Sequence, residues 1–98
     1  MDSGLRFLLL TPAKEVADCR CDAVNLFEKD KADGWGGGSV GIHHGHLPAV
    51  LALAEGGTVK AVREGKTVFS ACVRGGFARV DPDSVTVLTP EAEVTTDK

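Results

Sequence analysis

Three histidines and three cysteines are the residues in this chain that first suggest a metal site or nucleophilic chemistry. His43, His44 and His46 lie within four positions, and one residue separates Cys19 from Cys21. Structural zinc sites use four nitrogen or sulfur ligands, commonly spaced Cys-x₂₋₄-Cys and His-x₃₋₅-His. Neither group has this spacing. We therefore expect core cysteines and loop histidines rather than a metal site.

The remaining candidates for catalysis are weaker. Cys72 has no activating base that the sequence places beside it. The carboxylates fall mostly in turns and loops, so none is singled out as an acid with a raised pKa. The glycine-rich stretch 34–41 lacks the Gly-x₄-Gly-Lys-Ser/Thr pattern of a phosphate-binding loop. The sequence thus predicts no catalytic residue, no bound metal and no cofactor.

Length and composition favour one small soluble domain. The 98 residues fit a single unit, which we place at 1–94, followed by a polar tail at 95–98. The net charge is −3 and the basic residues form no cluster, which argues against nucleic-acid binding. No stretch approaches the roughly 18 apolar residues of a membrane-spanning helix, so we expect no direct membrane insertion. An odd number of cysteines fits a reducing, cytosolic compartment.

Hydrophobic alternation then indicates which elements must position these residues. Leu5–Leu10 alternates and closes at Thr11-Pro12, and 14–26 reads as a second extended stretch. Two alternating runs, 59–63 and 67–73, flank Glu64-Gly65 and predict a hairpin. Val85 and Val87 are expected to face one way. Strands separated by turns at this spacing predict an all-β fold, a small antiparallel β-sandwich.

Two segments leave alternatives open. The run 49–55 fits a short helix almost as well as a strand. The charged and then glycine-rich segment 28–38 predicts an exposed loop. Trp35 within it either contacts a partner or folds back over a sheet edge.

Four motifs in order along the chain resemble the epsilon subunit of F-type rotary ATP synthases. Leu10-Thr11-Pro12 is similar to the family's Leu-x-Thr-Pro element. The stretch 38–48 is similar to Gly-x-Phe-Gly-Ile-Leu-Pro-Gly-His-Ala-Pro, with matches at Gly38, Gly41, Ile42, Gly45, His46 and Pro48 and departures at Val40, His43, His44 and Leu47. The stretches 75–80 and 83–88 are similar to Gly-Gly-Phe-x-x-Val and Asn-x-Val-Thr-Val-Leu.

The resemblance implies a flattened antiparallel sandwich of about ten strands. It also implies a non-catalytic rotor subunit of the central stalk, which binds the gamma subunit and rests against the ring of c subunits during proton- or sodium-driven ATP synthesis or hydrolysis. The implied location is the cytoplasmic face of the cell membrane, peripheral, within the ATP synthase complex. The candidate partner-contact residues are Trp35, Gly38, Ser39, Val40, Gly41, Ile42, Gly45, His46 and Pro48.

Two departures from the family pattern carry expectations of their own. The C-terminal helical hairpin of longer family members is missing from this sequence, so we expect neither their inhibitory extension nor their ATP site. The loop 28–38 is longer and richer in glycine than in the family, in the region that is expected to face the c ring.

Two other classes of function remain as alternatives. A free-standing ligand-binding sandwich would favour an aromatic platform, but the chain has one Trp, four Phe and no Tyr. A metal-binding or redox module would use Cys19, Cys21 and the histidines.

Overall fold

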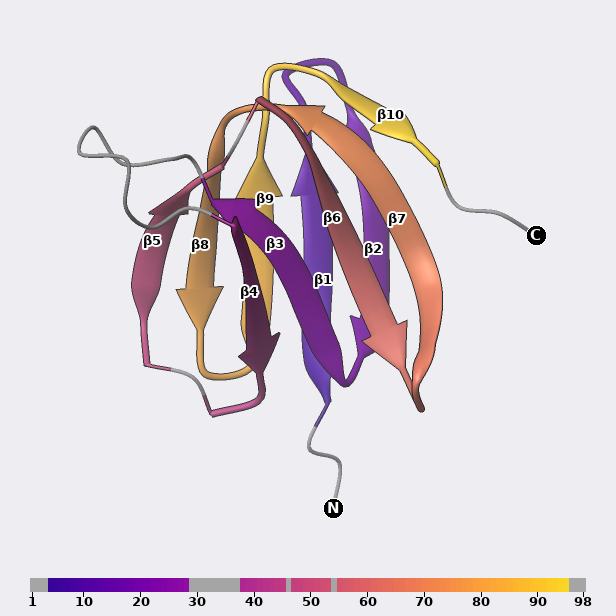
Figure 1. Ribbon diagram of the computed structural model, residues 1–98, viewed down its shortest axis with the longest axis vertical. Coiled ribbons are helices and arrows are strands. Elements are labelled where there is room, and N and C mark those ends of the chain that lie inside the picture. The colour runs from indigo at the N-terminus through magenta and orange to yellow at the C-terminus, as the bar shows by residue number, and fades with distance from the viewer. Residues whose placement is uncertain (1–3, 29–37, 46, 54, 96–98) are drawn as a thin grey trace.

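The computed structural model describes residues 4–28, 38–45, 47–53 and 55–95, and these residues form ten β-strands and no helix (Figure 1). The strands are β1 (Leu5–Leu10), β2 (Glu15–Cys21), β3 (Ala23–Glu28), β4 (Gly38–His43), β5 (Ala49–Ala52), β6 (Glu55–Arg63), β7 (Lys66–Arg74), β8 (Phe77–Asp81), β9 (Ser84–Leu88) and β10 (Ala92–Val94). None of the described residues belongs to a helix able to cross a membrane.

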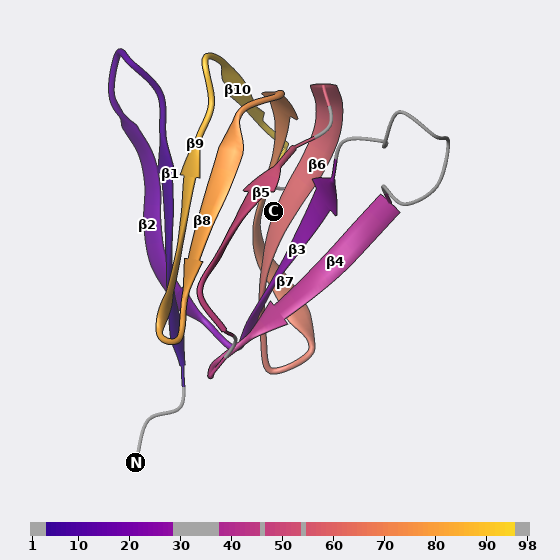
Figure 2. The ribbon, with the colours of Figure 1, turned by 90° about the vertical axis from the view of Figure 1, so that its left-hand side faces the viewer.

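The strands form two five-stranded sheets that face each other as the layers of a sandwich (Figure 2). Sheet A has the order β2-β1-β9-β8-β5, and sheet B has the order β10-β7-β6-β3-β4. The pairs formed by these ten strands are antiparallel except β1 with β9, which run parallel. The predicted all-β sandwich of about ten strands is confirmed.

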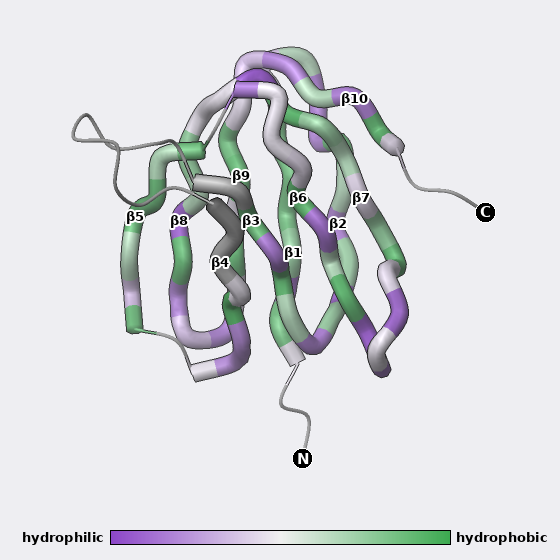
Figure 3. Tube along the Cα trace, viewed as in Figure 1, coloured by the Kyte–Doolittle hydropathy of each residue, from purple (hydrophilic) through white to green (hydrophobic). Residues whose placement is uncertain are grey.

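The core lies between the sheets because alternate side chains of each strand point inward. Figure 3 shows the resulting alternation of hydrophobic and hydrophilic residues along the strands. Phe7 of β1 reaches across to Phe69 of β7, with ring centroids 5.7 Å apart. Val85 and Val87 are both fully buried, so they face one way as their alternation predicted, and that way is into the core. Each such side chain stabilises the fold by about 1.5–3 kcal/mol through removal from water.

The single extended stretch predicted at 14–26 is wrong, because the chain turns at Asp22 from sheet A into sheet B. Cys21 and Val24 are both buried although an unbroken strand would put them on opposite faces. Backbone hydrogen bonds fix the corner: the Asp22 N–H donates to the Val62 carbonyl at 2.7 Å. The Glu64 N–H donates to Oδ2 of Asp22 at the same distance. Asp22 therefore ties the corner to the hairpin of sheet B.

The hairpin predicted around Glu64-Gly65 is confirmed as the connection between β6 and β7. Both turn residues have positive φ, 52° at Glu64 and 77° at Gly65. This is the conformation that lets a two-residue turn follow the right-handed twist of the strands. The ambiguous run at 49–55 is resolved as well, because its first four residues form β5.

Candidate partner-binding surface

The segment 38–48, which the sequence analysis selected for partner contact, forms the edge strand β4 and the turn that leads to β5. Gly41 is exposed, and a side chain there would lie 3.4 Å from Oδ1 of Asn25. Ile42 is fully buried in the core. Gly45 has φ of 88° and its N–H donates to the Pro82 carbonyl at 2.7 Å. Pro48 is exposed immediately before the first residue of β5.

The other candidates in this region are described in part or not at all. The backbone of Gly38, Ser39 and Val40 pairs with β3 as part of β4. Trp35 and His46 lie outside the described residues, as do 29–37 and the end of the polar tail, 96–98. Contact of these residues with a partner stays a prediction.

The residues that could do chemistry do not converge in the part of the chain that the structure describes. No three of its His, Cys, Asp and Glu side chains are grouped to hold a metal ion. His43 and His44 are exposed near the β4–β5 turn. Cys19 and Cys21 instead face the core from β2, where burial raises the pKa of both thiols, that of Cys21 to about 11. Such thiols are poor nucleophiles at neutral pH.

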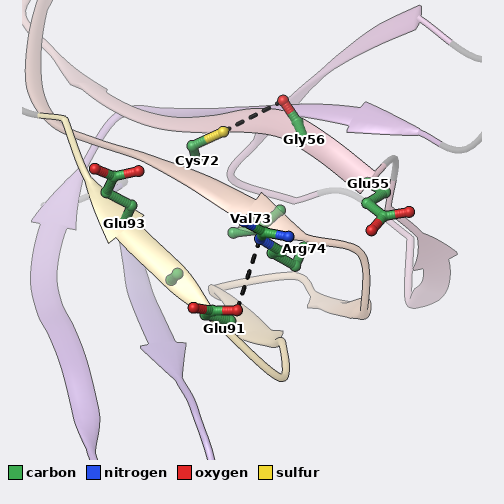
Figure 4. A pocket seen from close by; sticks show the side chains of 8 residues that line it. Glu55, Gly56, Cys72, Val73, Arg74, Glu91 and Glu93 are labelled. Carbon is green, nitrogen blue, oxygen red and sulfur yellow. Dashed lines mark hydrogen bonds and ion pairs between the residues drawn. The ribbon is translucent and has the colours of Figure 1, made fainter.

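A cavity of about 430 Å³ with both charged and apolar lining residues opens between β6, β7 and β10 (Figure 4). The Cys72 thiol donates to the Gly56 carbonyl at 3.3 Å, and Arg74 Nε lies 3.6 Å from Oε1 of Glu91. Figure 4 shows Glu55 and Glu93 on opposite sides of this ion pair. Because the ion pair is exposed and the Cys72 thiol donates its hydrogen bond to a backbone carbonyl rather than to a base, the cavity offers no arrangement for nucleophilic catalysis.

An apolar surface that the sequence analysis missed lies on the outer face of sheet A. Leu10 of β1 is in register with Leu88 of β9, Leu88 with Phe77 of β8, and Phe77 with Ala52 of β5. We call these four residues the apolar row. Phe77 and Leu88 remain 57% and 51% exposed, and because they are cross-strand neighbours they form a contiguous apolar patch rather than isolated exposed residues.

A shallow apolar cavity of about 460 Å³ adjoins the apolar row. It is lined by residues of the row together with Pro12, Gly76 and Pro90, and none of its lining residues is charged. A signal for this surface was present in the sequence. Phe77 and Leu88 lie out of phase with the buried residues Ala78 and Val87.

Gly76 sets the position of Phe77 within the apolar row. Its φ is 106°, and a Cβ at this residue would lie 2.2 Å from the Leu88 carbonyl oxygen. The Gly76 carbonyl accepts a hydrogen bond of 3.0 Å from the Leu53 N–H. Because Gly76 has no side chain, β8 can begin directly against the end of β9. The backbone of Gly76 also holds the end of β5.

The sequence of this chain is similar to that of known proteins. A family profile described as "ATP synthase, Delta/Epsilon chain, beta-sandwich domain" matches residues 5–95. An ATP synthase epsilon chain of Frankia casuarinae is 34% identical over 91 residues, which cover 93% of this chain and 98% of the relative. An ATP synthase epsilon chain of Bacillus velezensis is 36% identical over 85 residues, covering 87% of this chain but 58% of the relative.

Solved structures share the fold. A chain in the cryo-EM structure of the Euglena gracilis mitochondrial ATP synthase, which contains OSCP, F1 and the c ring, superposes with a TM-score of 0.74. The match covers 96% of this chain and 55% of the Euglena chain, at 23% sequence identity. The two chains therefore have the same sandwich in common.

Proposed function

Because the chain belongs to the family of ATP synthase delta/epsilon chain β-sandwich domains, we propose that it is a non-catalytic subunit of the central stalk of an F-type ATP synthase. In this role it binds the gamma subunit and rests against the c ring, so that rotation of the ring is passed to the stalk. The observation that carries the proposal is the family match, which extends from the first described strand to the last.

The physical properties of the sandwich support this role. A coupling subunit must keep its shape under load, and a core of interdigitated side chains between two sheets resists deformation. Burial raises the pKa of the Cys19 and Cys21 thiols, which disfavours their use as nucleophiles. Exposed apolar residues on sheet A supply a surface suited to a protein partner.

The proposal extends to where the subunit lies and which residues meet its partners. As a stalk component it lies peripherally at the cytoplasmic face of the membrane that holds the c ring. The segment 28–38, with Trp35, is assigned to the ring side. The stretch 38–48 is assigned to gamma. Of the candidate contact residues in it, Gly41, Gly45 and Pro48 are exposed in the part of the chain that the structure describes.

Gel filtration of this chain with the gamma subunit of the same organism tests the proposal. We expect the two proteins to co-elute as a stable one-to-one complex. Two folded proteins that elute separately at micromolar concentration would contradict it.

A loop variant separates the two assigned contacts. Deletion of most of 29–37 should weaken binding of the chain–gamma complex to detergent-solubilised c ring while co-elution with gamma persists. Unchanged binding to the ring would remove this segment from the proposed interface.

A further inference from the structure

Strand β5 has one side that pairs with no other strand in the part of the chain that the structure describes. It stands at the end of the sheet A order and pairs only with β8, in the register Ala49↔Val80 to Ala52↔Phe77. Figure 2 views the molecule from this side and shows β5 running along its flank. An edge of this kind presents backbone donors and acceptors to whatever approaches it.

The hydrogen bond at the end of β5 determines which backbone groups face the open side. The Leu53 N–H donates to the Gly76 carbonyl, and the register between β5 and β8 continues without a bulge. In an antiparallel pair, residues that exchange hydrogen bonds alternate with residues whose N–H and C=O groups point away from the partner. Counting back from Leu53, the backbone groups of Val50 and Ala52 therefore point away from β8.

The open edge lacks the features that usually prevent strand addition. Charged side chains, proline within the strand and bulges are the common devices. The described residues from Leu47 to Leu53 include no charged side chain, and β5 itself contains no proline. Val50 and Leu47 are 68% and 79% exposed although both are large and apolar.

The edge is continuous with the apolar row. Ala52 is the last member of the row, and Val50 lies two residues earlier on the same face of β5. A strand added beside β5 would lie about 4.8 Å away and would carry its own alternate side chains onto this face. Apolar residues at those positions would extend the row by one strand.

We propose that the open edge of β5 accepts an extended, uncharged segment of the gamma subunit as an additional strand of sheet A. Backbone hydrogen bonds to Val50 and Ala52 supply the attachment, and alternate apolar side chains of the added strand continue the apolar row. This inference rests on the proposed function, which makes gamma the partner. It adds the site and the backbone chemistry of the contact.

Amide hydrogen exchange on the complex, measured residue by residue by NMR, tests the proposal. On addition of gamma, exchange at Val50 and Ala52 should slow at least about fivefold, the effect of one net backbone hydrogen bond of ordinary strength. Unchanged exchange in a complex that forms would overturn strand addition and leave the proposed function standing. If no complex forms, the proposed function fails and this inference fails with it.

Amide hydrogen exchange at Val50 and Ala52 in the chain without gamma shows whether something else occupies the β5 edge. Slow exchange at every concentration would mean that the chain covers its own edge. Slow exchange that develops with rising concentration would mean that a second copy of the chain occupies the edge. Either result overturns the proposal.

Two variants at one position separate backbone attachment from simple apolar contact. V50P removes the outward N–H and leaves the hydrogen bonds to β8, because proline is tolerated where its nitrogen faces solvent. V50T keeps the N–H and the branched shape but loses apolar surface. We expect V50P to weaken gamma binding at least about tenfold and V50T to do so far less.

Equal losses in the two variants would show an apolar contact without strand addition. No loss in either would remove β5 from the interface. Melting of each free variant shows whether it is folded, and the exchange experiment on the unaltered chain decides the question if V50P is not.

Discussion

The two edges of sheet A are built differently. The β2 edge carries Glu15, Asp18 and Arg20 as exposed charged side chains, and its pairing with β1 shifts register between Leu9 and Leu10. The β5 edge is shorter and mostly hydrophobic, as its colour in Figure 3 shows. Both edges belong to the same sheet and border the same core. A difference in core burial therefore does not explain why the β2 edge is charged and the β5 edge is hydrophobic.

Charge and irregularity at an edge prevent pairing with another chain. Asp18 accepts two hydrogen bonds from the Arg6 guanidinium, from Nε at 3.0 Å and from Nη2 at 2.8 Å. This pair occupies the outer face of β1 and β2, so a strand approaching β2 would have to desolvate it. The β2 edge of sheet A is therefore suited to water and the β5 edge to a partner.

The largest expected effect is the loss of the β5 side of the sheet in the variant G76A. A Cβ at Gly76 would lie 2.2 Å from the Leu88 carbonyl oxygen, so the backbone must move and the hydrogen bond from Leu53 is disturbed. We expect a loss of about 3 kcal/mol or more in the free energy of unfolding, measured by urea titration.

The matched control is G65A, since Gly65 also has positive φ but no atom within 4 Å of the position that a Cβ would take. It should cost about 1 kcal/mol through backbone strain alone. Equal costs for G76A and G65A would show that close approach at Gly76 does not hold β5 and β8 together.

The reactivity of the cysteine thiols tests whether β2 stays paired with the rest of sheet A. With a pKa of about 11, Cys21 is a thiolate in only about one molecule in a thousand near pH 8. We expect iodoacetamide, followed by mass spectrometry, to modify Cys72 at least about tenfold faster than Cys21 in the folded chain. Similar rates would show that β2 detaches readily from the sheet.

The same burial gives stability a defined pH dependence. Because folding raises the pKa of the Cys21 thiol, its contribution is complete below the unfolded value of about 8.5 and is lost as the pH rises toward about 11. The variant C21A should lack this alkaline decline. If the decline persists undiminished, another group causes it.

Much of the fold was predictable because strand alternation is a local property. The inward phase of Val85 and Val87 needs no knowledge of any other strand. The corner at Asp22 was harder to predict, since Ala23 continues the apolar phase of Cys19 and Cys21 before the buried residues shift to Val24 and Leu26. The turn itself depends on hydrogen bonds to Val62 and Glu64, which are distant in the sequence.

The candidate surface was predictable only in part. The motif at 38–48 drew attention to a sheet edge, yet its Ile42 serves the core. The apolar row joins residues from four strands, so it exists only once the register of all four is known. The phase of Phe77 and Leu88 could have indicated exposure, but their proximity could not be read from the sequence.

Charge changes at the two edges give a smaller and unequal pair of effects. V50K places a charge on the open edge and should weaken gamma binding, because a lysine must be desolvated when a strand is added. D18V removes a charge from the β2 edge and should leave gamma binding unchanged. Gel filtration of each variant with gamma measures both. Identical behaviour of the two variants would mean that side-chain charge does not distinguish the edges.

The smallest expected effect concerns the ion pair that covers the β2 edge. Hydrogen bonds from the Arg6 guanidinium, with its positive charge, hold the pKa of the Asp18 carboxyl below its ordinary value. A lowered pKa stabilises the fold above the unfolded value and loses this contribution as the pH falls through the folded value. In the variant R6Q the carboxyl should titrate closer to its ordinary value, measured by NMR of the side-chain carbon.

The control R79Q alters an arginine on β8 of the same sheet, which pairs with Asp81. It should leave the titration of Asp18 unchanged. Because Arg6 and Asp18 are both exposed to water and screened by salt, we expect little change in the melting temperature of R6Q. A large change would mean that the pair holds β2 in place, rather than only making its edge unsuitable for a partner.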